Sequence, residues 1–252
     1  PRSTLFPYTT LFRSPVSGEI KKPAIYLDDG QFTYIPIHLN PEGSVFVVFS
    51  PGQPGQHITR VMKDGKEIFP ESGVAGSLFP HIDCFYRDNN IIAGLSQPGN
   101  YILRFSDGRE VSVIETEPYS EIPISSSTEI KFLNHWGPEE TITFNEFQSW
   151  TDFKDKRIRY YSGPAEYLTF FNNDRSITEG KKIYCDLGNV QEIAVVWVND
   201  QFAGVTWIAP FMLDITGFVQ EGTNKLKVRV VNSWVNRLVG DGDLPPEQRY
   251  TR

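Results

Sequence analysis

Short stretches of alternating hydrophobic and polar residues run along the whole chain, separated by Asn, Asp, Gly and Pro. Alternation with a period of two is typical of strands that bury one face. In the first half, this pattern predicts strands over residues 32–39, 44–49, 58–62, 67–69, 101–105 and 111–114. Asp64-Gly65 and Asp107-Gly108 lie between two pairs of these stretches, and Asp-Gly is a strong signal for an antiparallel hairpin.

The second half continues the pattern. Strands are predicted over residues 130–136, 140–144, 166–171, 182–186, 192–198 and 226–231, and a short helical turn over 145–153. Residues 117–128 are rich in Pro and Ser and break the periodicity, which is typical of a linker. We therefore expect an all-β protein with two antiparallel β-sandwich units, at 15–116 and 129–252, the second a jelly roll.

Residues 186–216 carry the clearest local signal. An alternating strand over 193–198 leads into Asn199-Asp200, and a second strand begins at Phe202. Asn and Asp tolerate the left-handed backbone of a tight turn, so this stretch predicts a hairpin. Trp197 lies inside the alternating strand, and we expect its ring to be in the core.

Composition limits the classes of partner. The 252 residues have room for two domains, and 39% are hydrophobic, which is enough for packed cores. A formal charge of −7 argues against nucleic acid and anionic membranes as partners. No apolar run is long enough to span a bilayer. Cys84 and Cys185 are interpreted as two free buried thiols, with a disulfide between them as the alternative.

Catalytic and metal-binding patterns are weak. Glycoside hydrolysis normally needs two carboxylates across the scissile bond, and none of the 31 Asp and Glu residues stands in such a context. Glu139-Glu140 is interpreted as a solvated turn, and the His residues at 38, 57, 81 and 135 lack ligand spacing. Asp241, Asp243 and Glu247 offer oxygen atoms to calcium, but a plain acidic turn is the simpler interpretation. We assign no catalytic residue, no metal site and no cofactor to this chain.

Aromatic residues beside polar ones are better candidates, because sugar rings stack on aromatic faces while their hydroxyls seek polar groups. The segment 234–238 is predicted to be a loop after the last strand, where functional residues gather. Trp207 follows a glycine in a turn-like stretch, and packing and ligand contact are equally good interpretations. The candidates for contact with carbohydrate or with another domain are Tyr160, Tyr161, Trp207, Trp234, Asn236, Arg237 and Asp241.

A wider set of short motifs points to a family. The following residues together resemble the sugar-binding β-sandwich of family 2 type glycoside hydrolases, which implies a jelly roll similar to galactose-binding domains: Asp186-Leu187-Gly188, Val198-Asn199, Gly204, Pro210-Phe211, Asp214-Ile215-Thr216 and 222–226. With 159–163, Trp207 and 232–241 added, the set resembles the C-terminal region of family 106 type, α-L-rhamnosidase-like enzymes. This resemblance covers residues 15–252.

The resemblance implies a parent enzyme that hydrolyses terminal α-L-rhamnosyl bonds by inversion, with carboxylates and calcium in a (β/α)₈ domain. No position of this chain matches that family's acid or base. The expected role is therefore accessory, with carbohydrate and the missing barrel as partners, in a protein exported to the periplasm or the exterior. A non-catalytic carbohydrate-binding or adhesion module and part of a family 2 type β-glycosidase remain as alternatives.

The N-terminal residues need separate treatment. Residues 4–14 are similar to the translated read-through of a short-read sequencing adapter. We therefore expect residues 1–14 to be an artefactual or disordered arm outside the natural fold, and the chain to be an interior fragment of a longer protein.

Overall fold

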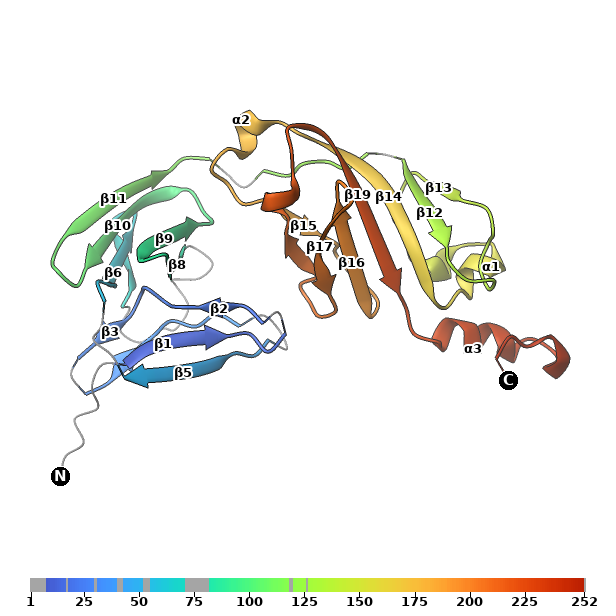
Figure 1. Cartoon of the computed structure of the whole chain (residues 1–252), viewed down its shortest axis with the longest axis horizontal. Coiled ribbons are helices and arrows are strands. Elements are labelled where there is room, and N and C mark those ends of the chain that lie inside the picture. Colours follow the sequence, from blue (N-terminus) through green and yellow to red (C-terminus); the bar gives the residue numbers. More distant parts are fainter. Residues whose placement is uncertain are drawn as a thin grey trace, which may run out of the picture. The chain divides into compact units, whose positions relative to one another are not determined.

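The computed structural model describes residues 8–16, 18–29, 31–39, 43–51, 55–70, 82–117, 120–125 and 127–251. The chain divides into two compact units, one ending at Ser120 and the other beginning at Glu121. This division falls inside the 117–128 segment that the sequence marks as a linker. Each unit is built from antiparallel sheets, which confirms the all-β sandwich class (Figure 1).

The N-terminal unit contains two larger sheets and two hairpins. One sheet has the order β2-β1-β5 and another β11-β10-β6-β7, while β3 pairs with β4 and β8 with β9. The bounds of these strands are β1 Tyr8–Arg13, β2 Ile20–Lys21, β3 Leu27–Asp28, β4 Thr33–Tyr34, β5 Phe46–Pro51, β6 Ile58–Lys63, β7 Lys66–Phe69, β8 Ile82–Arg87, β9 Asn90–Leu95, β10 Gly99–Phe105 and β11 Glu110–Glu115. The core of the unit includes Ile58, Val61, Ile82, Tyr101 and Leu103.

Three predictions for this unit need correction. The strand expected over 32–39 is reduced to β4, and its large apolar side chains at Phe32, Ile37 and Leu39 stay exposed. Alternation alone does not provide the pairing partner that a strand requires. The hairpin β8–β9 was missed, although Asp88 and Asn89 form its turn with the positive φ values of 49° and 66°.

The third correction concerns the expected arm at 1–14. Its described part contains β1, which pairs with β5 along six residues and with β2 at Phe12 and Arg13. This part is therefore strand, not a disordered arm, because its backbone groups find partners in two neighbouring strands. The similarity of residues 4–14 to an adapter is a statement about origin and stays a prediction.

The C-terminal unit is organised around a six-stranded sheet with the order β13-β12-β14-β19-β16-β17 (Figure 1). A second layer is formed by β15 paired with β18. The strands are β12 Thr128–Phe132, β13 Ile142–Phe144, β14 Pro164–Asn173, β15 Tyr184–Asp186, β16 Ile193–Val198, β17 Gln201–Thr206, β18 Met212–Asp214 and β19 Gly222–Val231. The short helices are η1 Trp150–Asp152, α1 Lys156–Arg159, α2 Arg175–Thr178, η2 Thr216–Phe218, α3 Val235–Gly242 and η3 Pro246–Gln248.

Alternation along the long strands decides which face is buried. In β19, Leu226 and Val228 lie in the core, while Lys225, Lys227 and Arg229 lie on the opposite face. Because successive side chains of a strand point to opposite faces, β19 has an apolar face toward the core and a charged face away from it. Cys185 and Ile215 belong to the same cluster as Val196, so the β15–β18 layer packs on the apolar face.

The hairpin β16–β17 confirms the turn predicted at Asn199-Asp200, whose φ values are 52° and 64°. The helical turn predicted over 145–153 is confirmed in part, as η1. By contrast, the predicted strand over 130–136 ends at Phe132, where Asn134 caps a turn by accepting a hydrogen bond from the Trp136 amide (3.0 Å). Cys84 and Cys185 are both free and buried, as expected, and burial raises the pKa of Cys185 to about 11.

Candidate functional site

Two exposed tryptophans lie at the same end of the six-stranded sheet. The strand register places Ala165, Val230, Ala194 and Thr206 in one row across β14, β19, β16 and β17. Trp207 follows this row directly, at the end of β17, and Trp234 follows it shortly after, in the segment that leaves β19. Trp207 is 53% exposed and Trp234 is 59% exposed. We call this edge the tryptophan end of the sheet, defined by Trp207 and Trp234.

The two rings are carried by strands that are not neighbours. β17 and β19 are separated by β16, so their backbones are two strand spacings apart, about 10 Å. Trp234 packs edge to face on Trp136, with ring centroids 4.9 Å apart, and His135 lies 5.7 Å from the same Trp136 ring. Trp136 itself belongs to the core beneath, which supports Trp234 from one side and leaves its other side exposed.

Two asparagine side chains fix the loops beside Trp234. Asn134 donates from Nδ2 to the carbonyl of Ser162 over 3.0 Å. Asn232 donates from Nδ2 to the carbonyl of Tyr161 over 3.0 Å and accepts at Oδ1 from the amide of Gly163 over 2.8 Å. These bonds tie the segment after β19 to the segment before β14. The backbone that carries Trp234 is therefore held by specific contacts.

Tyr161 is not available on the surface, contrary to its selection as a contact candidate. Its side chain is fully buried, and its hydroxyl donates to the carbonyl of Pro164 over 2.6 Å. The rings of Phe132 and Trp150 pack on it at 4.6 and 5.4 Å. The neighbouring Tyr160 is half-buried under Gly240 of α3. Sequence reasoning could not separate the two tyrosines, since adjacent aromatic residues give no sign of which ring turns inward.

The prediction of a loop over 234–238 is wrong, because residues Val235–Gly242 form the helix α3. Asn236 is half-buried, but Arg237 and Asp241 are only 4% and 3% exposed. Arg237 donates from Nε to Oδ1 of Asp241 over 2.9 Å, and the i, i+4 spacing places both on one face of the helix. The ring of Tyr250 lies 4.4 Å from Cζ of Arg237. Arg237 and Asp241 therefore form a buried ion pair, and their side chains do not reach a sugar at the surface.

The hydrogen-bond partners of Asp241 and the charge of Arg237 keep its carboxylate ionised. Burial acts to raise its pKa, but the hydroxyl and amide of Thr251 donate to Oδ2, and together with the Arg237 charge they lower the pKa to about 2. Both carboxylate oxygens are thus engaged, so Asp241 is not free to ligate calcium. Among the described residues, no cluster of three His, Cys, Asp or Glu side chains could hold a metal ion. His81 lies outside the described residues.

The polar residues of the motif that resembles a sugar-binding sandwich lie at the other end of the sheet. Asn224 is fully buried, and its Oδ1 accepts from Nδ2 of Asn199 over 2.8 Å. Asn224 also donates to the carbonyls of Gln220 and Gly222, and Asn199 accepts from the amide of Lys225. These residues close the turns before β17 and β19. Their contacts are structural, and the tryptophans lie at the opposite end of the same strands.

Trp197 is not a core residue, which corrects its predicted position. Ala194, Val196 and Val198 point into the core, so Trp197 lies on the other face of β16 and is half-buried there. Lys227 Nζ and Arg229 Cζ lie 4.5 and 5.4 Å from the centre of its ring. A period-two pattern does not say which of two apolar sets is inward when both contain large residues.

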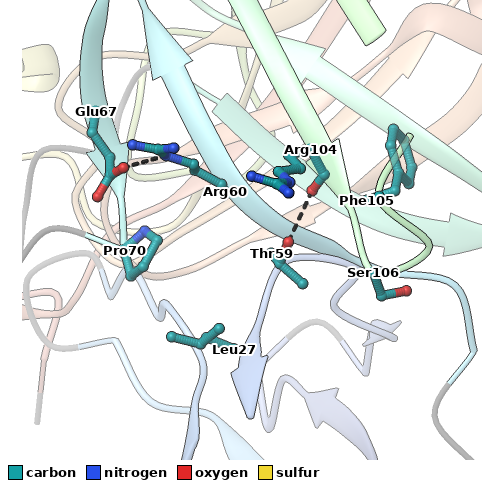
Figure 2. Close-up of a pocket in the computed structure, with 9 residues that line it drawn as sticks. Leu27, Thr59, Arg60, Glu67, Pro70, Arg104, Phe105 and Ser106 are labelled. Atoms are coloured by element: carbon teal, nitrogen blue, oxygen red, sulfur yellow. Dashed lines mark hydrogen bonds and ion pairs between the residues drawn. The ribbon is translucent and has the colours of Figure 1, made fainter. Parts of the chain in front are cut away.

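The N-terminal unit has a pocket of about 450 Å³ between β6, β7, β10 and Leu27 of β3 (Figure 2). Arg60 forms an ion pair with Glu67 at its wall, and Thr59 donates to the carbonyl of Arg104 over 3.3 Å. Among the described residues that line it, Glu67 carries the only carboxylate, and Arg60 pairs with it. Glu140, at the turn before β13, is likewise exposed and paired with Arg157. Neither position offers a pair of free carboxylates.

Comparison with known proteins links the chain to sugar-cleaving enzymes. No family model matches the sequence. A putative beta-glucuronidase of Formosa agariphila is 34% identical over 149 residues, which cover 59% of this chain and 13% of that protein. A beta-galactosidase of Clostridium acetobutylicum is 32% identical over 81 residues, 30% of this chain and 9% of that protein. A rhamnosidase structure from Novosphingobium sp. PP1Y aligns with 75% of this chain and 22% of its own, at 22% identity and a TM-score of 0.45.

The chain contains a region related to glycoside hydrolases. The sequence identity with the putative beta-glucuronidase carries this statement. The chain matches only a small part, 13% and 9%, of the two curated relatives. No helix among the described residues is long and apolar enough to cross a membrane.

Proposed function

We propose that this chain is an accessory, carbohydrate-binding-type region of a glycoside hydrolase whose catalytic (β/α)₈ domain lies elsewhere in the same polypeptide. The observation that carries the proposal is the pair Trp207 and Trp234, both exposed at the tryptophan end of the sheet, in a chain that contains a region related by sequence to sugar hydrolases. A sugar ring presents C–H groups on its faces, and an exposed indole offers a flat apolar surface of matching size.

The geometry supports contact with carbohydrate rather than catalysis. Trp234 is supported from below by Trp136, and its backbone is fixed by Asn134 and Asn232. A fixed ring loses little conformational freedom when a ligand stacks on it, which favours binding. Tyr160, which lies against Gly240 of α3, and Asn236, two residues after Trp234, are half-buried and are secondary candidates. We assign no catalytic role to any residue.

The finer assignments belong to the same proposal. The motifs support a galactose-binding-like jelly roll of an α-L-rhamnosidase-like parent, whereas the names of the curated relatives support a parent that acts on β-glucuronides or β-galactosides. In all three cases, the proposed parent is an exo-acting enzyme that removes a terminal sugar. We also propose that the parent is exported to the periplasm or the exterior, because members of the family that the motifs resemble usually are.

The experiment compares two polypeptides. The parent reading frame is recovered from the source DNA, and the parent and the 252-residue chain are assayed on 4-nitrophenyl α-L-rhamnoside, β-D-glucuronide and β-D-galactoside. We expect the parent to cleave one of them and the chain alone to cleave none. Turnover by the isolated chain at the parent's rate would overturn the proposal. A parent without a barrel would instead favour a non-catalytic binding or adhesion module.

A further inference from the structure

The helix α3 buries its polar side and exposes its apolar side. Its buried side carries the ion pair Arg237–Asp241 and Gly240. Its exposed side carries Val235, Leu238 and Val239, which are 59%, 55% and 59% exposed. These three residues follow the i, i+3, i+4 spacing of a single helical face. A surface helix normally buries its apolar face, whereas α3 turns that face to the outside.

Specific contacts hold α3 in this orientation. The amide of Arg237 donates to Oγ of Ser162 over 3.0 Å, and Thr251 binds Asp241 on the far side. Rolling the helix so that its apolar face turned inward would carry the ion pair out of its buried position and break these bonds to Ser162 and Thr251, which would leave polar groups without partners. The contacts of α3 with the rest of the C-terminal unit, which the helix follows directly after β19 (Figure 1), therefore fix the outward position of its apolar face.

We propose that the α3 face, defined as Val235, Leu238 and Val239, is the docking surface for a further domain of the same polypeptide, which contacts it through apolar side chains. This inference rests on the proposed function, because it needs a parent with another domain. A contiguous exposed apolar patch marks an interaction site. The face itself carries no charge, so the partner surface is apolar rather than acidic or basic.

The size of the face favours a tethered partner over a second copy. Three side chains on one helical turn are far short of the roughly 1,000 Å² that a stable association between separate chains needs. A domain on the same polypeptide is present at a high effective concentration, so a small apolar contact is enough to hold it. The curated relative has the room for such a domain, since this chain covers only 13% of it.

The test introduces one reactive thiol. Cys84 and Cys185 are buried, so the variant Val239→Cys places a single accessible thiol on the α3 face. Its rate of reaction with a maleimide is measured in the isolated 252-residue chain and in the parent polypeptide. We expect the reaction in the parent to be slower by at least about tenfold, because the neighbouring domain covers the thiol. The matched control is Gln201→Cys, exposed at the start of β17, which we expect to react equally fast in both.

Three results would overturn the inference while leaving the proposed function intact. The first is an equal rate at Val239→Cys in the parent and the isolated chain. The second is equal slowing at Gln201→Cys, which would mean that the protection is not specific to α3. The third is slowing in the isolated chain as its concentration rises, which would assign the face to a second copy. A parent that contains no further domain would defeat the proposed function as well.

A second variant tests the same contact through stability. Leu238→Glu places a charge on the α3 face, where in the isolated chain it is exposed to water. We expect the Tm of the isolated chain to be unchanged and that of the parent to fall, since the charge would be buried there. An unchanged Tm in both polypeptides would contradict the inference.

Discussion

Arg237 and Asp241 form an ion pair one helical turn apart, with Nε 2.9 Å from Oδ1 and both side chains buried. A buried pair of this kind holds its geometry only while both partners are charged. The arginine remains charged at any ordinary pH, so the charge of Asp241 decides whether α3 and the C-terminal segment stay in place.

The first prediction concerns pH. Replacement Asp241→Asn should lower the Tm at pH 7, because the amide cannot replace the charge that Arg237 and Thr251 surround. The folded state lowers the pKa of Asp241 to about 2, so its contribution to stability is complete above the usual value near 4 and is lost as the pH falls toward 2. The Tm difference between wild type and variant should therefore shrink below pH 4, as measured by calorimetry.

The control for that experiment is Asp243→Asn, at an exposed position two residues further along. Its effect on the Tm should be small at every pH. If Asp241→Asn lowered the Tm by the same amount at pH 7 and at pH 3, the lowered pKa of Asp241 would be wrong.

The second prediction concerns the packing under α3. A Cβ at Gly240 would lie 2.5 Å from Nη2 of Arg237 and 2.6 Å from Cβ of Tyr160. Gly240→Ala should therefore destabilise the chain by about 1–3 kcal/mol, a typical cost of overpacking. Gly242 ends the same helix, and a Cβ there would meet no atom within 4 Å, so Gly242→Ala should be neutral or slightly stabilising. Urea unfolding measures both, and equal effects would show that α3 does not lie against Tyr160.

The third prediction concerns the asparagine network at the other end of the sheet. Asn224→Ala removes four hydrogen bonds from a fully buried site and leaves Asn199 and backbone groups without partners. The expected loss is roughly 2–4 kcal/mol in the free energy of unfolding. Asn189→Ala, at an exposed turn, is the control and should change the free energy of unfolding by less than about 0.5 kcal/mol. A loss of similar size for both variants would argue against a structural role for Asn224.

The fourth prediction concerns a buried hydroxyl. Oγ1 of Thr169 is buried and finds no hydrogen-bond partner within the part of the chain that the structure describes. Thr169→Val keeps the shape and removes the unsatisfied group, so it should stabilise the chain by about 1 kcal/mol. Thr223→Val, at an exposed position of β19, should have little effect. A clear loss of stability for Thr169→Val in thermal unfolding would indicate a bound water at this hydroxyl.

The fifth prediction concerns sugar binding. Trp207→Ala and Trp234→Ala should each weaken binding of the preferred monosaccharide by roughly three- to tenfold, the range expected for the loss of one aromatic contact. Trp197→Ala is the matched control, since Trp197 lies on the outer face of the sheet beside Lys227 and Arg229. Calorimetric titration with L-rhamnose, D-glucuronate and D-galactose provides the measurement. Equal weakening by all three variants would exclude the tryptophan end as the specific site.

The sequence predicted the fold better than the site. The β6–β7 and β16–β17 hairpins could be predicted because their turns need residues that accept a positive φ, and Asp64-Gly65 and Asn199-Asp200 supply them. The shortening of the strand predicted over 32–39 could not be predicted, because a strand exists only where a neighbour completes its hydrogen bonds. That neighbour is set by the whole fold.

The site was harder for a different reason. Trp207 and Trp234 are exposed, and their contact with a sugar or another domain stays a prediction, whereas Arg237 and Asp241 form a buried pair. The i, i+4 spacing of Arg237 and Asp241, with apolar residues between them, is a helical signal that the interpretation as a loop ignored. Attention to that period would have found α3.

The separation of the two ends of the sheet has a consequence for inferring function by similarity. The Asn199–Asn224 network is needed to close the sandwich, while the tryptophans at the other end are not. Under the proposed function, substitutions at Trp207 or Trp234 would change the sugar that is recognised and leave the asparagine network intact. Under the same proposal, a shared asparagine motif indicates a shared scaffold only, and the sugar would have to be established from the residues at the opposite end of the sheet.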